Sequence, residues 1–441
     1  MSAQNQHLED LLSALSRKAE QAEVFAVESE STSISFEAGE LKSSLVEETR
    51  GIALRGLVNG RVGFTATSGS ADPEPLVERA VASARFGEPV SLALPGALPG
   101  RSVSAWDASL AEVPLDRLVE VGREVIARLR EADPSAKIDV DIERTNMRAT
   151  LCNSAGAHVD QQASAFHVVM SVERLRGDDV LMAHDSASST SLTEDYREAA
   201  ERLAWRIATA DRSAEADSGQ MPVLFTPAGS MVLLLPLLMA VNGQNVQRGT
   251  SPLADRAGEQ ILDTRFTLWD DPTVPGRPAS AAYDDEGVPC YRKALFRQGV
   301  LESFLLDLKT AALLGTASTG NGARGLFSLP TPSAANLVMD AGERPLEDMI
   351  SDVERGLLVD SVLGLGQGNP LSGAFSNPVG LAYVIEHGEI TGRVEGLSLA
   401  GNVYELLRTI GGTSVERQWV RGRYLLPHIL LPKVDVVRSK A

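Results

Sequence analysis

Histidines and cysteines are the side chains of this chain that could hold a transition metal. The sequence has 6 histidines and 2 cysteines, and no two histidines have the i, i+4 spacing that places two ligands on one helix face. His158 and His167 lie in neighbouring segments with strand-like patterns, and Cys152 is close to them in sequence. One hypothesis is a metal site built from these three residues. The alternative is that they are ordinary surface or hydrogen-bonded side chains.

An acidic segment in the second half, YDDEGVP at residues 283–289, could also do chemistry. Asp284, Asp285 and Glu286 precede a glycine there. Three neighbouring carboxylates could bind a cation through their oxygen atoms. The alternative is the polar tip of a hairpin, because acidic residues next to glycine are typical of tight turns.

A glycine-containing segment, TASTGNGARG at residues 316–325, is a second candidate for ligand contact. Its small residues would let the backbone approach a ligand, while Asn321 and Arg324 offer hydrogen-bond donors. The alternative is a flexible loop. The glycines of residues 364–368 predict a tight turn, because no helix signal follows them. The sequence has no GxSxG nucleophile motif and no GxxxxGK[ST] phosphate loop.

The charge balance argues against nucleic acid as a partner. The chain has 441 residues, with 41 Lys and Arg against 59 Asp and Glu, and a formal net charge of -18 at pH 7. A nucleic-acid-binding surface needs clustered basic residues, and the sequence has no Lys/Arg run. The cysteines form no CxxC pair, so we expect a reducing, cytoplasmic setting. The amphipathic N-terminus lacks the continuous apolar region of a secretory signal.

An apolar run, MVLLLPLLMAV at residues 231–241, raises the question of a membrane span. It is interrupted only by Pro236. It falls well short of the roughly 20 residues that a membrane helix needs. The run therefore predicts a buried helix or strand, and we expect no association with a membrane.

The hydrophobic pattern predicts the elements that must position these residues. Residues 22–67 are predicted to form several short antiparallel strands, with a hairpin at Asn59-Gly60. A capping box of Ser191 and Glu194 is expected to open a helix. Apolar residues at helical spacing and helix start signals predict four helices, over residues 7–19, 72–87, 114–130 and 191–209.

Two domains are predicted because the residue composition changes along the chain. The polar segment at residues 211–222, which contains glycine and proline, is the best boundary candidate. We expect an α+β protein. Residues 1–215 would form an N-terminal domain with an antiparallel sheet and helices, and residues 216–441 a glycine-rich, strand-rich C-terminal domain.

Five segments, in this order along the chain, carry a family resemblance. They are ISFEAGELKSSLVEETRGIALRGLVNGRVGFTATS, YDDEGVPCYRKALFRQGVLESFLLDLKTAALLG, TGNGARG, SAANLVMDAGE and GLLVDSVLGLGQGNPLSGAFSNPVGLAYVIEHGEITGRVEGLSLAGNVYELLRTI. Together they resemble the TldD/TldE family, also called PmbA or "modulator of DNA gyrase" proteins, over most of the chain. The word gyrase does not imply DNA binding, which an acidic chain without a basic patch does not support.

The resemblance aligns the apolar run with the zinc-binding helix of the family. The TldD-like branch of the family carries HExxxH on a helix, with two zinc ligands and a glutamate base, and the TldE-like branch lacks it. Laid on that motif, the run has Leu235 and Ala240 at the histidine positions and Pro236 at the glutamate. Leucine and alanine have no lone pair for a metal, and proline cannot act as a base. The chain therefore resembles the TldE-like branch.

The resemblance implies a non-catalytic, peptide-binding subunit of a heterodimeric zinc metallopeptidase that degrades or processes unfolded peptides. Zinc would be held by a TldD-like partner, with no cofactor in this chain, and an isolated chain could form a homodimer. Two alternatives stay open, a stand-alone hydrolase with a rebuilt site and a non-enzymatic, peptide-binding homodimer. The residues expected to line the substrate cavity combine loop chemistry with family position, and they are Asn242, Asp284, Asp285, Asn321, Arg324 and Gln367.

Overall fold

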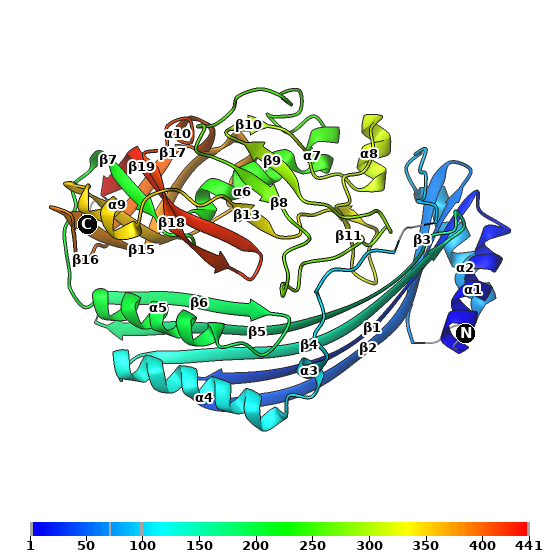
Figure 1. The fold of residues 1–441 in the computed structure, drawn as a ribbon, viewed down its shortest axis with the longest axis horizontal. Helices are drawn as coiled ribbons and strands as arrows, with labels where there is room; N and C mark the ends of the chain where they lie inside the picture. The colour runs from blue at the N-terminus through cyan, green and yellow to red at the C-terminus, as the bar shows by residue number, and fades with distance from the viewer. Residues whose placement is uncertain (1–2, 70–71, 98–99, 178, 439–441) are drawn as a thin grey trace.

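The computed structural model describes residues 3–69, 72–97, 100–177 and 179–438. Two large sheets and a set of helices make up an α+β fold (Figure 1), which confirms the predicted class. The first sheet is antiparallel, in the order β3-β2-β1-β4-β5-β6. Its strands are β1 (Gln21–Glu37), β2 (Glu40–Val58), β3 (Arg61–Ser68), β4 (Lys137–Asn153), β5 (His158–Arg176) and β6 (Asp179–Ser189).

The expectation of several short strands was wrong, because β1 and β2 are single strands of 17 and 19 residues. Serines and charged residues interrupt the apolar pattern in mid-strand, yet the ladder continues through them. Ser31, for example, pairs with Glu47 on one side and with Thr145 on the other. The hairpin at Asn59-Gly60 is confirmed, since both residues have positive φ angles, 50° and 68°.

Helices cover one face of the first sheet at both of its ends. Near one end, α4 (Leu115–Ala132) and α5 (Asp195–Thr209) share a core with β1, β4, β5 and β6. Near the other end, α1 (Ala3–Ser16) and α2 (Pro73–Ser83) pack against β1 and β2. The predicted capping box does not form, because α5 begins at Asp195 without a side-chain cap. The 3-10 helix η1 (Ala84–Phe86) follows α2.

The second sheet contains a closed barrel. Strands β7 (Gly219–Phe225), β14 (Arg355–Val362), β15 (Ala374–Glu386), β17 (Leu397–Asn402) and β19 (Tyr424–Arg438) pair in turn, and β19 pairs with β7. The remaining strands of this sheet are β8 (Leu268–Asp270), β9 (Lys293–Arg297), β10 (Val300–Leu301), β13 (Leu337–Met339), β16 (Glu389–Arg393) and β18 (Gly412–Val420). A separate pair is formed by β11 (Gly322–Ala323) and β12 (Thr331–Pro332).

The apolar run forms a buried helix, α6 (Met231–Val241). It shares one core with the barrel strands, including Phe225, Val359 and Leu431. Pro236 lies inside the helix, where it cannot donate the usual hydrogen bond to the carbonyl of Val232. In the described ranges, no helix is long and apolar enough to cross a membrane. The shorter helices are α3 (Ala108–Ala111), α7 (Gly243–Gln247), α8 (Leu308–Leu314), α9 (Leu346–Ser351), α10 (Val403–Leu406) and the 3-10 helix η2 (Pro370–Ser372).

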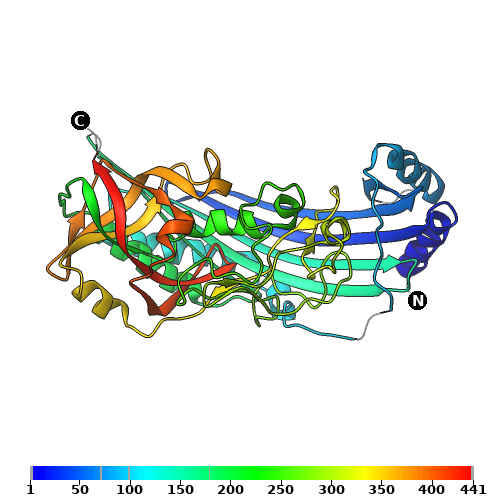
Figure 2. The ribbon, with the colours of Figure 1, turned by 90° about the horizontal axis from the view of Figure 1, so that it is seen from above.

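The long strands of the first sheet curve beneath and beside the second sheet (Figure 1). Seen from above, the barrel and its loops overlie one end of these strands, while α1 and α2 lie at the far end (Figure 2). The predicted division at residues 215 and 216 falls in the connection between α5 and β7. The face of the first sheet that carries no helices is therefore turned toward the C-terminal half.

A close contact in α4 gives a test of the packing. A Cβ added at Gly122 would lie 2.2 Å from the ring of Phe36 on β1. In an exposed helix, Gly→Ala stabilises by about 1 kcal/mol, but here we expect Gly122→Ala to destabilise, since overpacking costs roughly 1–3 kcal/mol. Thermal unfolding measures the sign. Arg123→Ala, at the exposed neighbouring position, is the control. A higher midpoint for Gly122→Ala would contradict the tight packing.

Candidate functional site

A cavity of about 560 Å³ lies between the two halves of the chain. One wall comes from β4, β5 and β6, with Met147, His167 and Ser188. The other wall comes from loops of the C-terminal half, at residues 278–285, 320–323, 333–335 and 421–423. We refer to this hollow as the interdomain cavity.

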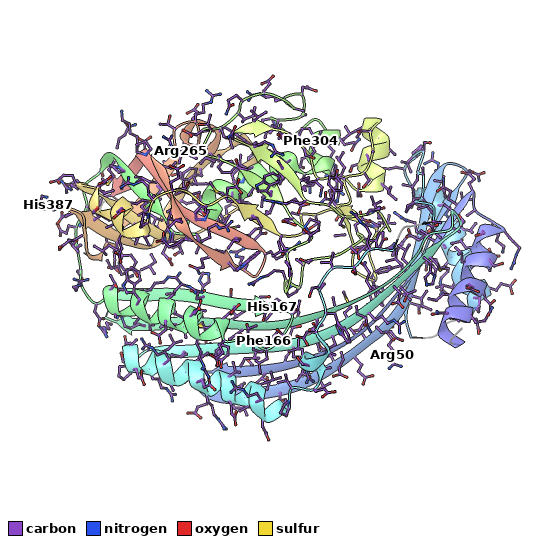
Figure 3. The ribbon with its side chains drawn as sticks, in the orientation of Figure 1. Arg50, Phe166, His167, Arg265, Phe304 and His387 are labelled. Atoms are coloured by element: carbon purple, nitrogen blue, oxygen red, sulfur yellow. The ribbon has the colours of Figure 1, made fainter. Side chains whose placement is uncertain are left out.

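Strand alternation explains why β5 contributes His167 to this cavity. Successive side chains of a strand point to opposite faces. Phe166 is buried in the core with α4 and α5, so His167 points to the other face, where the cavity lies. Figure 3 labels both residues on β5. His167 pairs across the strands with Ser188, which lines the same cavity, and burial lowers the pKa of the His167 imidazole.

The acidic segment 283–289 is a hairpin turn, but a buried one. Its carboxylates point to different partners instead of converging on one point. Asp284 accepts hydrogen bonds from the backbone N–H groups of Glu286, Val288 and Gly322, at 3.0, 2.8 and 2.8 Å. Asp285 accepts one from the N–H of Arg324 at 2.9 Å. Burial raises the pKa of both Asp284 and Asp285. The segment is therefore a hairpin turn, and its carboxylates do not form a cation site.

The third acid of this turn joins a buried ion-pair network between the two halves of the chain. Arg55 on β2 contacts Glu286 at 2.5 Å and Glu23 on β1 at 2.8 Å, and Arg324 contacts Glu23 at 2.8 Å. None of the four side chains is more than 4% exposed. We call these four residues, Glu23, Arg55, Glu286 and Arg324, the interdomain network.

The two acids of the interdomain network respond differently to their surroundings. Burial by itself would raise the pKa of Glu23, but Arg324 and Arg55 lower it by more, so its pKa is below the usual value. Burial raises the pKa of Glu286 by more than Arg55 lowers it, and nearby Asp307 adds to the rise. Glu23 has two arginine partners and Glu286 has one, which accounts for the difference.

The glycines of residues 316–325 serve close packing against the acidic turn. A Cβ added at Gly322 would lie 2.4 Å from the carboxylate of Glu286, and one at Gly320 would lie 2.8 Å from the carbonyl of Pro289. Asn321 is buried and donates to the carboxylate of Asp270 at 2.7 Å. The segment is thus held in place by its neighbours and forms part of the cavity wall.

The six residues that were expected to line one substrate cavity do not all lie in the same cavity. Asp284, Asp285 and Asn321 line the interdomain cavity. Arg324 lies behind its wall in the interdomain network. Asn242 lines an adjoining hollow of about 230 Å³, which shares residues 333–335 and Arg423 with the larger cavity. Gln367 is exposed on the loop after β14 and borders neither hollow.

His158, His167 and Cys152 do not form a metal site. The two histidines are nine residues apart on β5, which separates them by about 30 Å and places them on opposite faces. Cys152 pairs with His158 across β4 and β5 but is buried against α1 and α2. Over the described ranges, no group of three or more His, Cys, Asp or Glu side chains could hold a metal ion.

The residues of α6 do not fit a zinc ion either. Ala240 is fully buried in the barrel core, and Pro236 is buried with it. Leu235 is half-buried beside Gly366. None of these side chains has a donor atom for a metal.

Comparisons with known proteins match most of the chain. The family described as "PmbA/TldA metallopeptidase C-terminal domain" matches residues 218–438, and "PmbA/TldA metallopeptidase domain 1" matches residues 22–84. A metalloprotease of Methanothermobacter thermautotrophicus is 25% identical over 427 residues, or 93% of this chain and 92% of the relative. A TldD homolog of Haemophilus influenzae is 34% identical over 197 residues, or 44% of this chain and only 41% of that relative.

Solved structures share the fold over nearly the whole chain. The crystal structure of TldE from Thermococcus kodakarensis has a TM-score of 0.89 and 28% identity, and the match covers 98% of this chain and 99% of that one. A putative modulator of DNA gyrase from Thermotoga maritima has a TM-score of 0.88 and 24% identity, covering 98% and 100%.

The interdomain network predicts that a buried ion pair contributes much more to the free energy of unfolding than an exposed pair does. Arg55→Met should destabilise the protein by roughly 3–5 kcal/mol, because it leaves Glu23 and Glu286 buried without their shared cation. Arg128→Met breaks an equally close pair, Arg128–Glu201 at 2.6 Å, on the surface, and should cost at most about 1 kcal/mol. Urea unfolding of both variants makes the comparison. Equal effects would contradict the role of burial.

Asp285 predicts a pH dependence of stability. Its pKa is raised by burial, so the folded state holds its proton to higher pH than the unfolded chain does. The buried charge therefore weakens the fold as pH rises from the unfolded pKa through the folded one. Asp285→Asn should unfold at a higher temperature than the natural protein at pH 8, with the difference shrinking toward pH 4. Asp255→Asn, at an exposed position, should show no such trend.

Proposed function

This chain belongs to the PmbA/TldA metallopeptidase family, and from that premise we propose that it is the non-catalytic, peptide-binding subunit of a two-subunit zinc metallopeptidase. A related, TldD-like chain would hold the zinc and activate water. The present chain would close the substrate cavity around that site and hold the peptide.

The composition of α6 is the observation that carries this proposal. At the positions that the family resemblance assigns to HExxxH, the chain has Leu235, Pro236 and Ala240, and the last two are packed into the core. Metal-ligating or basic groups at these positions would need polar partners that the surrounding apolar core does not provide. A peptidase that includes this chain would therefore take its zinc from elsewhere.

The interdomain cavity supports the peptide-binding role. Its volume, about 560 Å³, is in the range of ligand sites. Long stretches of its wall are loop backbone with small side chains, such as residues 278–282 and 333–335. Such a wall favours an extended peptide, because main-chain hydrogen bonds and shallow side-chain contacts place few demands on sequence. Low sequence selectivity suits a peptidase that acts on unfolded chains.

Zinc content and peptidase activity of the chain, alone and with its partner, test the proposal. We expect no stoichiometric zinc and no cleavage of an unfolded protein by the isolated chain. Co-expression with the TldD-like gene of the same organism should give a complex with about one zinc per pair that cleaves it. Removal of the zinc by a chelator should abolish cleavage. Stoichiometric zinc or cleavage by the isolated chain would overturn the subunit role.

A cavity-blocking variant separates peptide binding from assembly. Ala163 on β5 lines the interdomain cavity, so Ala163→Trp should fill it and lower cleavage by the complex at least about tenfold. Ala127→Trp, on the exposed side of α4, is the matched control. Both variants should still assemble with the zinc subunit in size-exclusion chromatography. Full activity of Ala163→Trp would remove the cavity from the proposal.

A further inference from the structure

The interdomain cavity has an unusual charge pattern for so acidic a chain. Three arginines line it without a carboxylate partner among the described residues, and they are Arg101, Arg421 and Arg423. Arg101 donates to the carbonyl of Cys290 at 2.9 Å, and Arg423 donates to the carbonyls of Ala334 and Ala335. In the described part of the chain, the side chain of Arg421 has no hydrogen-bond or ion-pair partner.

The carboxylates of the cavity are already satisfied. Asp160 is held by Arg148, which donates from Nε to Oδ1 at 2.8 Å and makes a second bond from Nη2. Asp284 and Asp285 accept backbone N–H groups, and burial favours their neutral forms. The charges left unpaired in the cavity are therefore positive.

Two further polar groups of the cavity lack partners. Ser188 is 4% exposed, and its hydroxyl oxygen is buried without a hydrogen-bond partner among the described residues. The imidazole of His167, opposite Ser188, makes no hydrogen bond in that part of the chain, and Glu143 of β4 lies beside it on its other side. A buried hydroxyl is normally hydrogen-bonded. That of Ser188 is enclosed beside Gly422 and is not open to the cavity, whereas the half-buried His167 lines it.

The turn between β18 and β19 brings Arg421 to these groups. A Cβ added at Gly422 would lie 2.6 Å from the Cβ of Ser188 and 3.9 Å from the ring of His167, so only glycine allows this close approach. Arg277 fixes the same contact, since it stacks on Trp419 at 4.2 Å and donates to the carbonyl of Ser188 at 2.6 Å. The backbone of this turn therefore lies beside Ser188 and His167, and the exposed side chain of Arg421 borders the cavity from it.

We propose that Arg421, Arg423 and Arg101, together with His167 from the sheet wall, bind carboxylate groups of the substrate peptide. We call these four residues the anion subsite. The proposal rests on the peptide-binding function and adds a preference to it. A carboxylate accepts hydrogen bonds from imidazole and guanidinium groups, and it is the anion that peptides carry.

The net charge of the chain opposes the binding of an anionic peptide elsewhere on its surface. With a formal charge of -18, the protein repels anions at long range. Salt screens this repulsion beyond about 8 Å at physiological ionic strength. Inside the cavity, Asp160 is neutralised by Arg148, so the unpaired arginines are the charges that favour an anionic group.

The carboxylate has two possible sources in a peptide, the C-terminal α-carboxylate and an Asp or Glu side chain. Four otherwise identical hexapeptides distinguish them, with a free or amidated C-terminus and with Glu or Gln at a central position. Their binding is measured by calorimetry to the chain alone and to its complex with an inactivated zinc subunit. We expect each matched carboxylate to tighten binding about tenfold over its amide, and acetate to compete.

Arg421→Gln is the decisive variant. Gln298 holds the same positive-φ position before a glycine, at 49° against 50° for Arg421, so glutamine is compatible with this turn. The variant should remove the carboxylate preference and leave binding of the amidated Gln peptide unchanged. Arg79→Gln, which removes the same charge from an exposed position on α2, should keep the preference.

The outcomes separate this inference from the proposed function. Equal binding of all four peptides by the natural protein would overturn the anion subsite alone. A preference that persists in Arg421→Gln would also overturn it, because the carboxylate would then bind elsewhere. Failure of every peptide to bind the chain and the complex would overturn the peptide-binding function itself, and the subsite with it.

Discussion

The structure depends on the buried charges of the interdomain network. Glu23 and Arg55 belong to the first sheet, whereas Glu286 and Arg324 belong to loops of the C-terminal half. Buried charges are costly unless each is paired, so the loops have one low-energy position against β1 and β2. That position sets the acidic turn and the glycine segment beside it, and these two segments form one wall of the cavity. The cavity therefore exists because the two halves are fastened at one end of the long sheet.

A second contact fastens the other end of the cavity. The turn between β18 and β19 rests on β5 and β6 through Gly422. Nearby, Arg206 of α5 joins Asp185 of β6 to Asp360 of the barrel, at 3.2 and 3.0 Å. With both ends held, the middle of the helix-free face stays open. This explains why β1 keeps a polar side-chain row in mid-strand, since no apolar layer covers it.

Local patterns were sufficient to predict much of the fold, but not the site. Helical spacing located α1, α2 and α4 to within a few residues, and Asn59-Gly60 identified its hairpin. The full length of β1 was not predicted, because the side chains in the middle of this strand are polar on both faces and show no apolar alternation. Arg324 was expected in the cavity, but its partner Glu23 lies 301 positions away, and no local pattern reports such a pairing. His158 and His167 looked close in sequence, yet an odd spacing on one strand places them on opposite faces.

The helix α6 and the cavity are separate parts of the structure, which bears on how a metallopeptidase family can include a chain without a metal motif. The core around α6 is apolar and packs closely around Pro236 and Ala240. The contacts that hold the acidic turn and the turn at Gly422 in the cavity wall do not involve α6. The residues at the motif positions of α6 can therefore differ without altering those contacts. Under the proposed function, the shape and charge of the cavity are what this chain contributes to peptide binding.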